Sequence, residues 1–472
     1  MALAVNEQSE QVAALAKQWP LLEALQEGTP AMRKGRTMFL PKWPNEEAQS
    51  YDARVATATL FPAYRRTVSV MSGKPFAEPV TLNDDVPAQL VSLAEDVDRM
   101  GVNLHAFASE MFDEAMGYGF CGILVDYPDT MVRDDQGRPL PNQPRRTVAE
   151  IEREGIRPYW VRVKHNQILG WRTETRNGRQ QLSQLRLLES VEEEDGDFGT
   201  KQVQQVRVLY PGSWQLWRQT GDKGEWEIYR EGRTSLTEIP FAPIYGRREG
   251  FMIGKPPMLD LAYLNVKHWQ SQSDQDTIEH VARVPILAVI GVDAKDVQLT
   301  VGANSAVALP DNGDMKYVEH SGNSIKAGAD SLIRLEEQMI QSGAELLVKK
   351  PGDRSATESA NDAEGNKSDL QRMAEMFMDS LDLALYFTAK FMGLPSGGTV
   401  KLFTDFGAGT LSEASSQLVL NIQQGGLITK GTAIKELQRR GVLDEAVDAE
   451  TELALVEAEG PAPGTMTDEE PE

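Results

Sequence analysis

A long helix with a polar middle places the strongest limit on what this chain can fold into. Residues Met258–Val284 are preceded by Pro256 and Pro257 and followed by Pro285, and prolines so placed are typical of a helix start and stop. A helix of this length spans about 40 Å. Its middle, QSQSDQDT, is polar on every side. We therefore expect that the helix cannot pack into one core along its whole length, and that part of it faces water or another subunit.

The segments around this helix predict a mostly helical α+β fold. Upstream, residues 1–70 have helical patterns, CGILVDYP predicts a buried strand, and residues 158–245 alternate in hydrophobicity as antiparallel strands do. Downstream, we expect a strand-rich excursion, two further long helices, one returning strand in GGTVKLFTDFG and a helical end module. The apolar stripe of the first of these helices is Leu332, Leu335, Met339, Ile340, Gly343 and Leu346. The stripe of the second is Leu370, Met373, Phe377, Leu381, Ala384 and Leu385.

Length and charge narrow the functional classes. The chain has 472 residues, enough for two or three cores, and a formal net charge of −23. Residues 441–472 hold eleven Asp or Glu and no Lys or Arg, and the acidic run ESVEEEDGDFG at 189–199 predicts a solvated hairpin tip. This charge argues against a protein that grips nucleic acid by a broad basic face. It does not argue against a protein that lets nucleic acid slide past.

Features that the sequence lacks narrow the cellular compartment of the protein and the reactions it could catalyse. The sequence has no apolar run long enough for a membrane span, and its N-terminus lacks the pattern of a signal peptide. A single cysteine, Cys121, cannot form a disulfide within the chain, which fits a reducing cytoplasm. GYGFCG at 117–122 follows a helix and opens a strand, the reverse of a dinucleotide-binding motif, and predicts a tight turn. We expect Cys121 to be a buried apolar residue rather than a nucleophile.

No catalytic, cofactor or metal site is predicted. The five histidines include no pair spaced as zinc ligands on a helix, and no G-x-S-x-G elbow is present. A short basic break, KKPGDR, joins the last two long helices and contains Lys349, Lys350 and Arg354. A Ser-x-x-Glu capping box at Ser355 predicts a helix start after it, and Ser368 offers a second start. Taken alone, the break is typical of an exposed connector between helices.

The order of these parts resembles the portal proteins of tailed bacteriophages. Six short sequence segments also resemble this family. They are YDARVATATLFPAYRRTV, NLHAFASEMFDEAMGYGFCGILVDYP, LDLAYLNVKHW, DMKYVEHSG, LEEQMIQSGAELL and RSATESANDAEGNKSDLQRMA. The first of these segments begins at residue 51 and the last ends at residue 374. The acidic run near residue 193 and the acidic C-terminus are not part of the family pattern, and the resemblance assigns them no role.

The resemblance implies a division of the chain into portal elements. In chain order, the expected elements are an N-terminal region and wing 1–257 with its β section 158–245, stem helix 258–284, clip 285–325, second stem helix 326–348, tunnel loop 349–355, long helix and returning wing strand 356–409, helical crown 410–460, and disordered acidic tail 461–472.

The resemblance also implies partners and a site. Portal subunits form a ring, commonly of twelve, at one capsid vertex, through which double-stranded DNA is packaged and ejected without sequence specificity. The partners implied are the terminase large subunit, the tail adaptor and the major capsid or scaffold proteins, in a virion assembled in the host cytoplasm. The tunnel-loop candidates are Lys349, Lys350 and Arg354, and the channel-wall candidates on the first stem helix are Gln270, Gln272, Asp274 and Asp276.

Two other functional classes stay open at the level of sequence. One is a different head–tail connector or scaffold ring protein, although connectors are usually much shorter than this chain. The other is an enzyme of unrecognised chemistry with an acidic cleft, which would need converging titratable groups.

Overall fold

A computed structural model gives the fold of most of the chain. It describes residues 3–130, 150, 153–220, 224–283, 286–290, 314–318, 323–344, 367–404, 406, 423, 429–439, 443, 448, 451–452 and 454–455. By contacts between residues the chain divides into two units. The first holds Met1–Gly73, Thr81–Leu346 and Met376–Lys401, and the second holds Lys74–Val80, Leu347–Glu375 and Leu402–Glu472.

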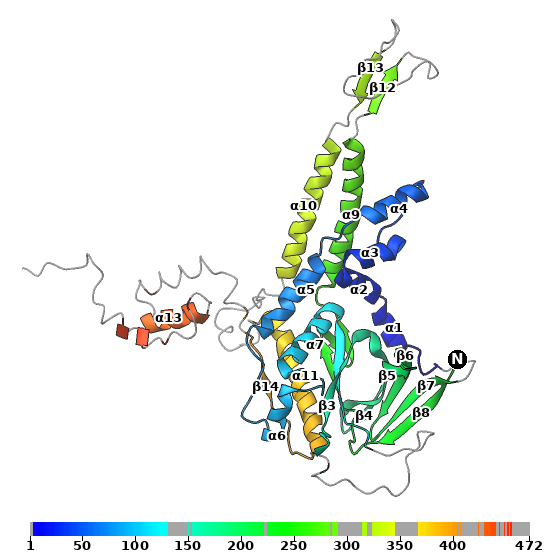
Figure 1. Cartoon of the computed structure of the whole chain (residues 1–472). Coiled ribbons are helices and arrows are strands. Elements are labelled where there is room, and N and C mark those ends of the chain that lie inside the picture. The colour runs from blue at the N-terminus through cyan, green and yellow to red at the C-terminus, as the bar shows by residue number, and fades with distance from the viewer. Residues whose placement is uncertain are drawn as a thin grey trace, which may run out of the picture. The chain divides into compact units, whose positions relative to one another are not determined.

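Helices and an antiparallel β section alternate along the chain and confirm the predicted α+β class (Figure 1). The α-helices are α1 Glu10–Ala16, α2 Trp19–Glu27, α3 Thr29–Gly35, α4 Ala48–Thr57, α5 Ala63–Gly73, α6 Ala88–Val91, α7 Leu104–Tyr118, α9 Leu259–Ala282, α10 Asn323–Ala344, α11 Asp369–Met392 and α13 Lys430–Arg439. Short 3₁₀ turns are η1 Arg36–Met38, η2 Lys74–Phe76, η3 Ser92–Glu95 and η4 His165–Gln167.

The strands form small sheets with antiparallel pairing. Five strands, in the order β4-β5-β6-β7-β8, make the largest sheet, and β3-β2-β9 make a second. The strands are β1 Thr81–Leu82, β2 Phe120–Asp126, β3 Tyr159–Val163, β4 Ile168–Arg176, β5 Arg179–Asp195, β6 Gly199–Tyr210, β7 Ser213–Thr220, β8 Glu225–Arg233, β9 Phe241–Tyr245, β10 Arg247–Gly250, β11 Ile253–Lys255, β12 Ile286–Ile290, β13 Asp314–Val318 and β14 Val400–Lys401.

The core of the first unit lies where α7, β2 and α11 meet. Phe112 of α7 and Phe377 of α11 are both buried, with ring centroids 5.1 Å apart. The predicted stripe of α11 from Phe377 to Leu385 is buried as expected, and β2 is buried along nearly its whole length. Cys121 of β2 is also buried, and burial raises the pKa of its thiol, so it is a core residue as predicted.

The tight turn predicted from GYGFCG is present between α7 and β2. Gly119 ends α7 with φ near 90°, a conformation that L side chains rarely adopt. A Cβ at this position would come within 2.3 Å of the backbone nitrogen of Pro256. The glycine therefore lets the chain segment that leads into α9 pass directly over the end of α7.

The second unit is described in part. α11 begins at a reciprocal cap in which Ser368 Oγ accepts from the Gln371 backbone N–H, and Gln371 Oε1 accepts from the Ser368 N–H. This confirms the second predicted helix start. The first, at Ser355, lies outside the described residues, as does Leu346 of the predicted α10 stripe.

Two expectations from the sequence are corrected. Ile340, assigned to the buried stripe of α10, is 74% exposed. The returning strand is only the two residues of β14, which pair with the equally short β1. The polar middle of α9 has both enclosed and exposed positions, as expected of a helix that does not pack into one core along its whole length, since Ser273 and Gln275 are almost fully enclosed and Asp276 is exposed. The clip predicted at 285–325 is described only through the pair β12–β13 and the first residues of α10.

Asp382 of α11 ties that helix to the short sheet β1–β14. Its carboxylate accepts a hydrogen bond from the Val400 backbone N–H at 2.8 Å. Burial raises the pKa of this carboxyl to about 6, the Val400 N–H opposes the shift, and the charges of Asp379 and Asp85 add to it. The folded state therefore holds this proton more tightly than the unfolded chain does.

We expect Asp382→Asn to stabilise the protein at pH 7.5 and to lose that advantage as the pH falls towards 4. Wild type gains stability as the pH drops through about 6, because its folded carboxyl is then protonated, whereas the amide does not titrate. The asparagine oxygen still accepts from Val400. Thermal melts should show a higher Tm, by roughly 2–4 °C for each kcal/mol gained.

Asp379→Asn is the matched control, because Asp379 is exposed on the same helix and its removal deletes only a neighbouring charge. Its effect should be smaller. Two results would contradict the raised pKa of Asp382. One is a Tm of Asp382→Asn below that of wild type at pH 7.5, and the other is a Tm difference between the two proteins that is the same at pH 7.5 and at pH 4.

Candidate functional site

The helical hairpin α9–α10 contains the channel-wall residues proposed from the sequence. Figure 1 shows the two helices side by side, and β12 and β13 lie between them in the chain. α9 has 24 residues and α10 has 22, so both are about 33–36 Å long. Helices of this length need partners along their sides, and those partners decide which faces of the hairpin stay free.

Polar side chains of α9 pack directly against α10. Gln275 Nε2 donates to the Ile325 carbonyl at 3.0 Å, at the start of α10. Gly328 makes room for it, because a Cβ there would lie 2.0 Å from Gln275 Oε1. One further contact joins His268 Nε2 and Glu336 Oε1, 3.2 Å apart. Part of the polar tract is therefore an internal hydrogen-bonded seam and not a solvated surface.

A second side of α9 is covered by the N-terminal helices. Asn265 is fully buried, and its amide donates to the Phe61 carbonyl at 2.8 Å while its oxygen accepts from the Tyr64 N–H at 2.9 Å. Tyr64 lies in the first turn of α5, so Asn265 serves as a cap for that helix from another part of the chain. Farther along α9, Gln270 Nε2 donates to the Phe39 carbonyl at 2.9 Å.

Arg54 of α4 extends this covered side. Its guanidinium forms two hydrogen bonds with the Glu46 carboxylate, at 2.8 and 2.9 Å, and lies 4.1 Å from the Trp43 ring centroid. It also lies 3.7 Å from Asp274 Oδ1 of α9. Burial raises the pKa of the Asp274 carboxyl, and the Arg54 charge opposes that shift. Asp274 thus belongs to a contact within the chain.

The four channel-wall candidates consequently separate into two pairs. Gln270 and Asp274 contact the N-terminal segment, whereas Gln272 and Asp276 hydrogen-bond to each other at 2.7 Å and leave Asp276 exposed. The tunnel-loop candidates Lys349, Lys350 and Arg354 lie outside the described residues.

Sequence reasoning missed two features of the hairpin. Asn265 was not singled out, because a lone asparagine in an apolar run carries no pattern that names its partner. The other is an exposed apolar pair on α10, where Ile333 is 54% and Ile340 is 74% exposed. These residues are seven apart and so share one face of the helix. Ile340 was placed on the buried stripe because positions 339 and 340 both fit an apolar periodicity of three to four residues.

In the described part of the chain, no group of three or more His, Cys, Asp and Glu side chains is arranged to hold a metal ion. His165 is buried between Glu114 and Glu23, with Nδ1 2.6 Å and Nε2 3.2 Å from their oxygens, and it stacks on Tyr118. This arrangement links α2, α7 and η4. Within the described helices, none is both long and apolar enough to cross a membrane.

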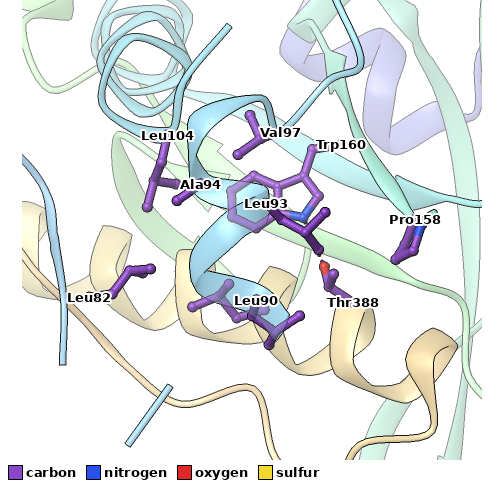
Figure 2. Close-up of a pocket in the computed structure, with 10 residues that line it drawn as sticks. Leu82, Leu90, Leu93, Ala94, Val97, Leu104, Pro158, Trp160 and Thr388 are labelled. Atoms are coloured by element: carbon purple, nitrogen blue, oxygen red, sulfur yellow. Dashed lines mark hydrogen bonds between the residues drawn. The ribbon is translucent and has the colours of Figure 1, made fainter. Parts of the chain in front are cut away.

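A small cavity in the first unit is part of the core rather than a ligand site. Figure 2 shows its mainly aliphatic walls around Trp160, whose Nε1 donates to Thr388 Oγ1 at 2.9 Å. Its volume is about 10 Å³. That volume is close to the smallest that holds one water molecule, and the single polar pair already satisfies itself.

Comparison with known proteins gives one family match and several structural similarities. A family model described as a domain of unknown function (DUF4055) matches residues 257–392, from the start of α9 to the end of α11. A chain of the virion of a native gene transfer agent particle is 13% identical with a TM-score of 0.39, over 81% of this chain and 90% of that chain. No curated protein matches.

Two further structures come from the neck of such particles. A chain from the neck of the empty particle, computed with C6 symmetry, is 14% identical with a TM-score of 0.39. A chain from the neck of the native particle, computed with C12 symmetry, is 13% identical with a TM-score of 0.38. Each covers 81% of this chain and 90% of the other chain. TM-scores this low assign neither a fold nor a function to the chain.

We expect Asn265→Ala to destabilise the first unit by about 1–3 kcal/mol, because it leaves the buried Tyr64 N–H without its partner and removes one of the two hydrogen bonds that the Phe61 carbonyl accepts. Gln272→Ala on the exposed side of the same helix is the control and should change stability by no more than about 0.5 kcal/mol. Chemical unfolding followed by circular dichroism compares the two. Equal unfolding midpoints for the Asn265→Ala and Gln272→Ala variants would show that Asn265 does not hold α5 to α9.

Proposed function

We propose that this chain is a structural subunit of the head–tail region of a phage-like particle and, more specifically, a portal protein. The observation that carries the proposal is the hairpin α9–α10. Gln275 and Gln270 of α9 form hydrogen bonds within the chain, while α10 keeps Ile333 and Ile340 exposed. The sequence resemblance to portal proteins supports the same conclusion.

The exposed isoleucines favour association with other copies of the chain. Burying two such side chains contributes about 1.5–3 kcal/mol each at every contact. A head-to-tail contact repeated by rotation closes a ring, and the resemblance implies twelve copies. The proposed ring lies at one capsid vertex of a virion assembled in the host cytoplasm, contacts the terminase large subunit and then the tail adaptor, and adjoins the major capsid or scaffold proteins.

The proposed channel passes double-stranded DNA without sequence specificity and without an enzymatic step of its own. Duplex DNA carries one phosphate charge per about 1.7 Å, so a basic wall would hold it by counterion release, whereas an acidic or polar wall repels it. Of the four wall candidates, Gln272 and Asp276 stay available for this role, because Gln270 and Asp274 contact the N-terminal segment. Lys349, Lys350 and Arg354 are proposed to form a sparse basic belt that touches passing phosphates.

Ring formation should depend on the exposed face of α10. We expect Ile333→Glu/Ile340→Glu to abolish closed rings, because each contact would then bury carboxylates in place of apolar side chains. Gln338→Glu/Gln341→Glu adds the same charge at two other exposed positions of α10 and should still form rings. Multi-angle light scattering after size exclusion separates the outcomes. Wild-type assembly by the isoleucine variant would remove α10 from the subunit contact.

DNA retention should depend on the basic belt. We expect Lys349→Ala/Lys350→Ala/Arg354→Ala to form rings and begin packaging, but to retain full-length genomes poorly at high filling, because each phosphate contact is weak and screened by salt. The control Arg172→Ala/Arg176→Ala/Arg179→Ala removes the same charge from exposed positions of β4 and β5. Genome length in purified particles is the readout. Wild-type retention by the first variant would make the loop a simple connector.

A further inference from the structure

The hairpin β5–β6 ends in a turn that projects one large apolar side chain into solvent. Asp195 and Gly199 pair at the end of the two strands, and residues 196–198 form the turn. Gly196 has a φ of 75°, and a Cβ on Gly199 would lie 2.5 Å from the Asp195 carbonyl oxygen, so both positions favour glycine. Phe198 is 102% exposed, more than any other large apolar side chain in the described part of the chain. The hairpin thus presents an aromatic ring that the rest of the described chain leaves uncovered.

The charge around Phe198 narrows the kind of partner that could cover it. Residues 189–199 contain six carboxylates and no lysine or arginine. Glu194, Asp195 and Asp197 of this run are exposed beside the turn. Negative charge of this density is repelled by nucleic acid and by anionic membrane surfaces. An aromatic side chain in this setting matches a protein cavity that is apolar inside and basic at its rim.

A cavity of about 390 Å³ lies at the other end of the same sheet. It is lined by the end of β2 and the residues after it, by β6, β7 and β8, and by Phe391 of α11. β6 has 12 residues, so its two ends lie about 36–40 Å apart. Tyr210 at the far end of β6 pairs with Ser213, and Ser213 pairs with Arg233 of β8. Phe198 of one copy therefore cannot reach the cavity of the same copy.

Aromatic side chains line much of this cavity. They are Tyr127, Tyr159, Tyr210, Trp214 and Phe391, all partly exposed. Tyr127 and Phe391 stack with ring centroids 5.7 Å apart and planes 19° from parallel. Gly232 of β8 makes room for Trp214 opposite it on β7, because a Cβ on Gly232 would lie 2.6 Å from the indole ring. Rings that are partly exposed in this way pack favourably against a further aromatic ring, edge to face or offset.

The charged groups in the interior of the cavity neutralise one another within the chain. Arg207 forms salt bridges with Asp126 and Glu189. Asp126 also accepts a hydrogen bond from the Tyr159 hydroxyl at 3.1 Å. Aromatic surface is therefore the main contact that the interior offers, and it matches an apolar side chain better than a charged one.

The rim of the cavity is basic on the side of β8. Arg233 is exposed and forms no salt bridge with a carboxylate of the described residues. Arg230 stacks on Tyr229 and donates to its hydroxyl, a neutral partner that does not cancel the positive charge. Asp129 adds a negative charge on the opposite wall. Carboxylates that approach the rim are therefore attracted to the β8 side.

We propose that Phe198 of one copy of this chain inserts into the cavity of a neighbouring copy. The ring packs against the aromatic side chains of the cavity, and the carboxylates of Asp195 and Asp197 face Arg233 at the rim. Because the inserted turn and the cavity are different surfaces, the contact runs head to tail, and its repetition by rotation closes a ring. The inference rests on the proposed ring and adds a second contact to that of α10.

Cross-linking between two single-cysteine variants tests this contact. Thr200→Cys places a thiol near Phe198, and Ser235→Cys places one in the lining of the cavity, without a change in charge. The native Cys121 is buried and does not compete for the reagent. With a short bismaleimide, a mixture of the two variants should give at least ten times more cross-linked dimer than either variant alone.

Further variants separate the aromatic from the charged part of the contact. Thr200→Cys/Ser235→Cys in one chain should give a ladder of products longer than dimers. Adding Phe198→Ala should lower the yield at least tenfold, whereas Phe198→Tyr, which keeps the aromatic ring, should preserve it. The control is Met100→Ala, at another exposed apolar position of the first unit, and it should change nothing. Arg233→Glu should lower the yield at low salt.

Several results would overturn the inference. They are no cross-linking between the two single-cysteine variants, a yield unchanged by Phe198→Ala, or a double variant that gives dimers only, which would indicate a reciprocal pair. Light scattering of the wild-type protein separates this inference from the ring itself. Rings that form without these cross-links would contradict the Phe198 contact alone, whereas a monomeric wild type would contradict both proposals.

Discussion

The buried polar side chains of α9 are the constraint on which the rest of the first unit depends. Every polar group of a helix with QSQSDQDT at its centre costs free energy if it is enclosed without a partner. In the described part of the chain, Ser273 Oγ, His268 Nδ1 and Trp269 Nε1 of α9 are enclosed in this way, whereas other polar side chains of the helix find partners. Asn265 and Gln270 bind backbone groups of the N-terminal segment, and Gln275 binds the start of α10. The order of the N-terminal helices along α9 follows from these contacts. So does the division of α9 into covered faces and a free one.

The sequence predicted the fold well wherever a residue's role depends on its own neighbours in the chain. The β section, the buried stripe of α11 and the tight turn at Gly119 follow from alternation, helical spacing and small residues. It failed where the role depends on a distant partner. Gln275 is buried because Gly328 leaves it room, and Ile340 is exposed although its spacing fits the stripe. Likewise, Asp274 was assigned to a channel wall, but Arg54, 220 positions earlier, lies beside it.

The candidate site illustrates the same limit. Of the residues proposed from sequence for the wall, two contact the protein itself and two stay on a free face. Polarity alone could not separate them, because a helix that binds its own chain through hydrogen bonds and a helix that faces a water-filled channel have the same composition. The exposed isoleucines of α10 are stronger evidence for a contact between subunits than the polar residues of α9 are. An apolar face without a partner in its own described chain favours association, whereas a free polar face does not.

The central claim, that this chain closes into a ring, is tested most directly by electron microscopy of the purified wild-type protein. The account predicts closed rings with a central hole wide enough for duplex DNA, with the α9–α10 hairpins arranged around that hole. Rings should persist at micromolar protein concentration and in moderate salt, since an apolar contact is not screened. A population made up only of monomers and dimers under the same conditions would contradict the account.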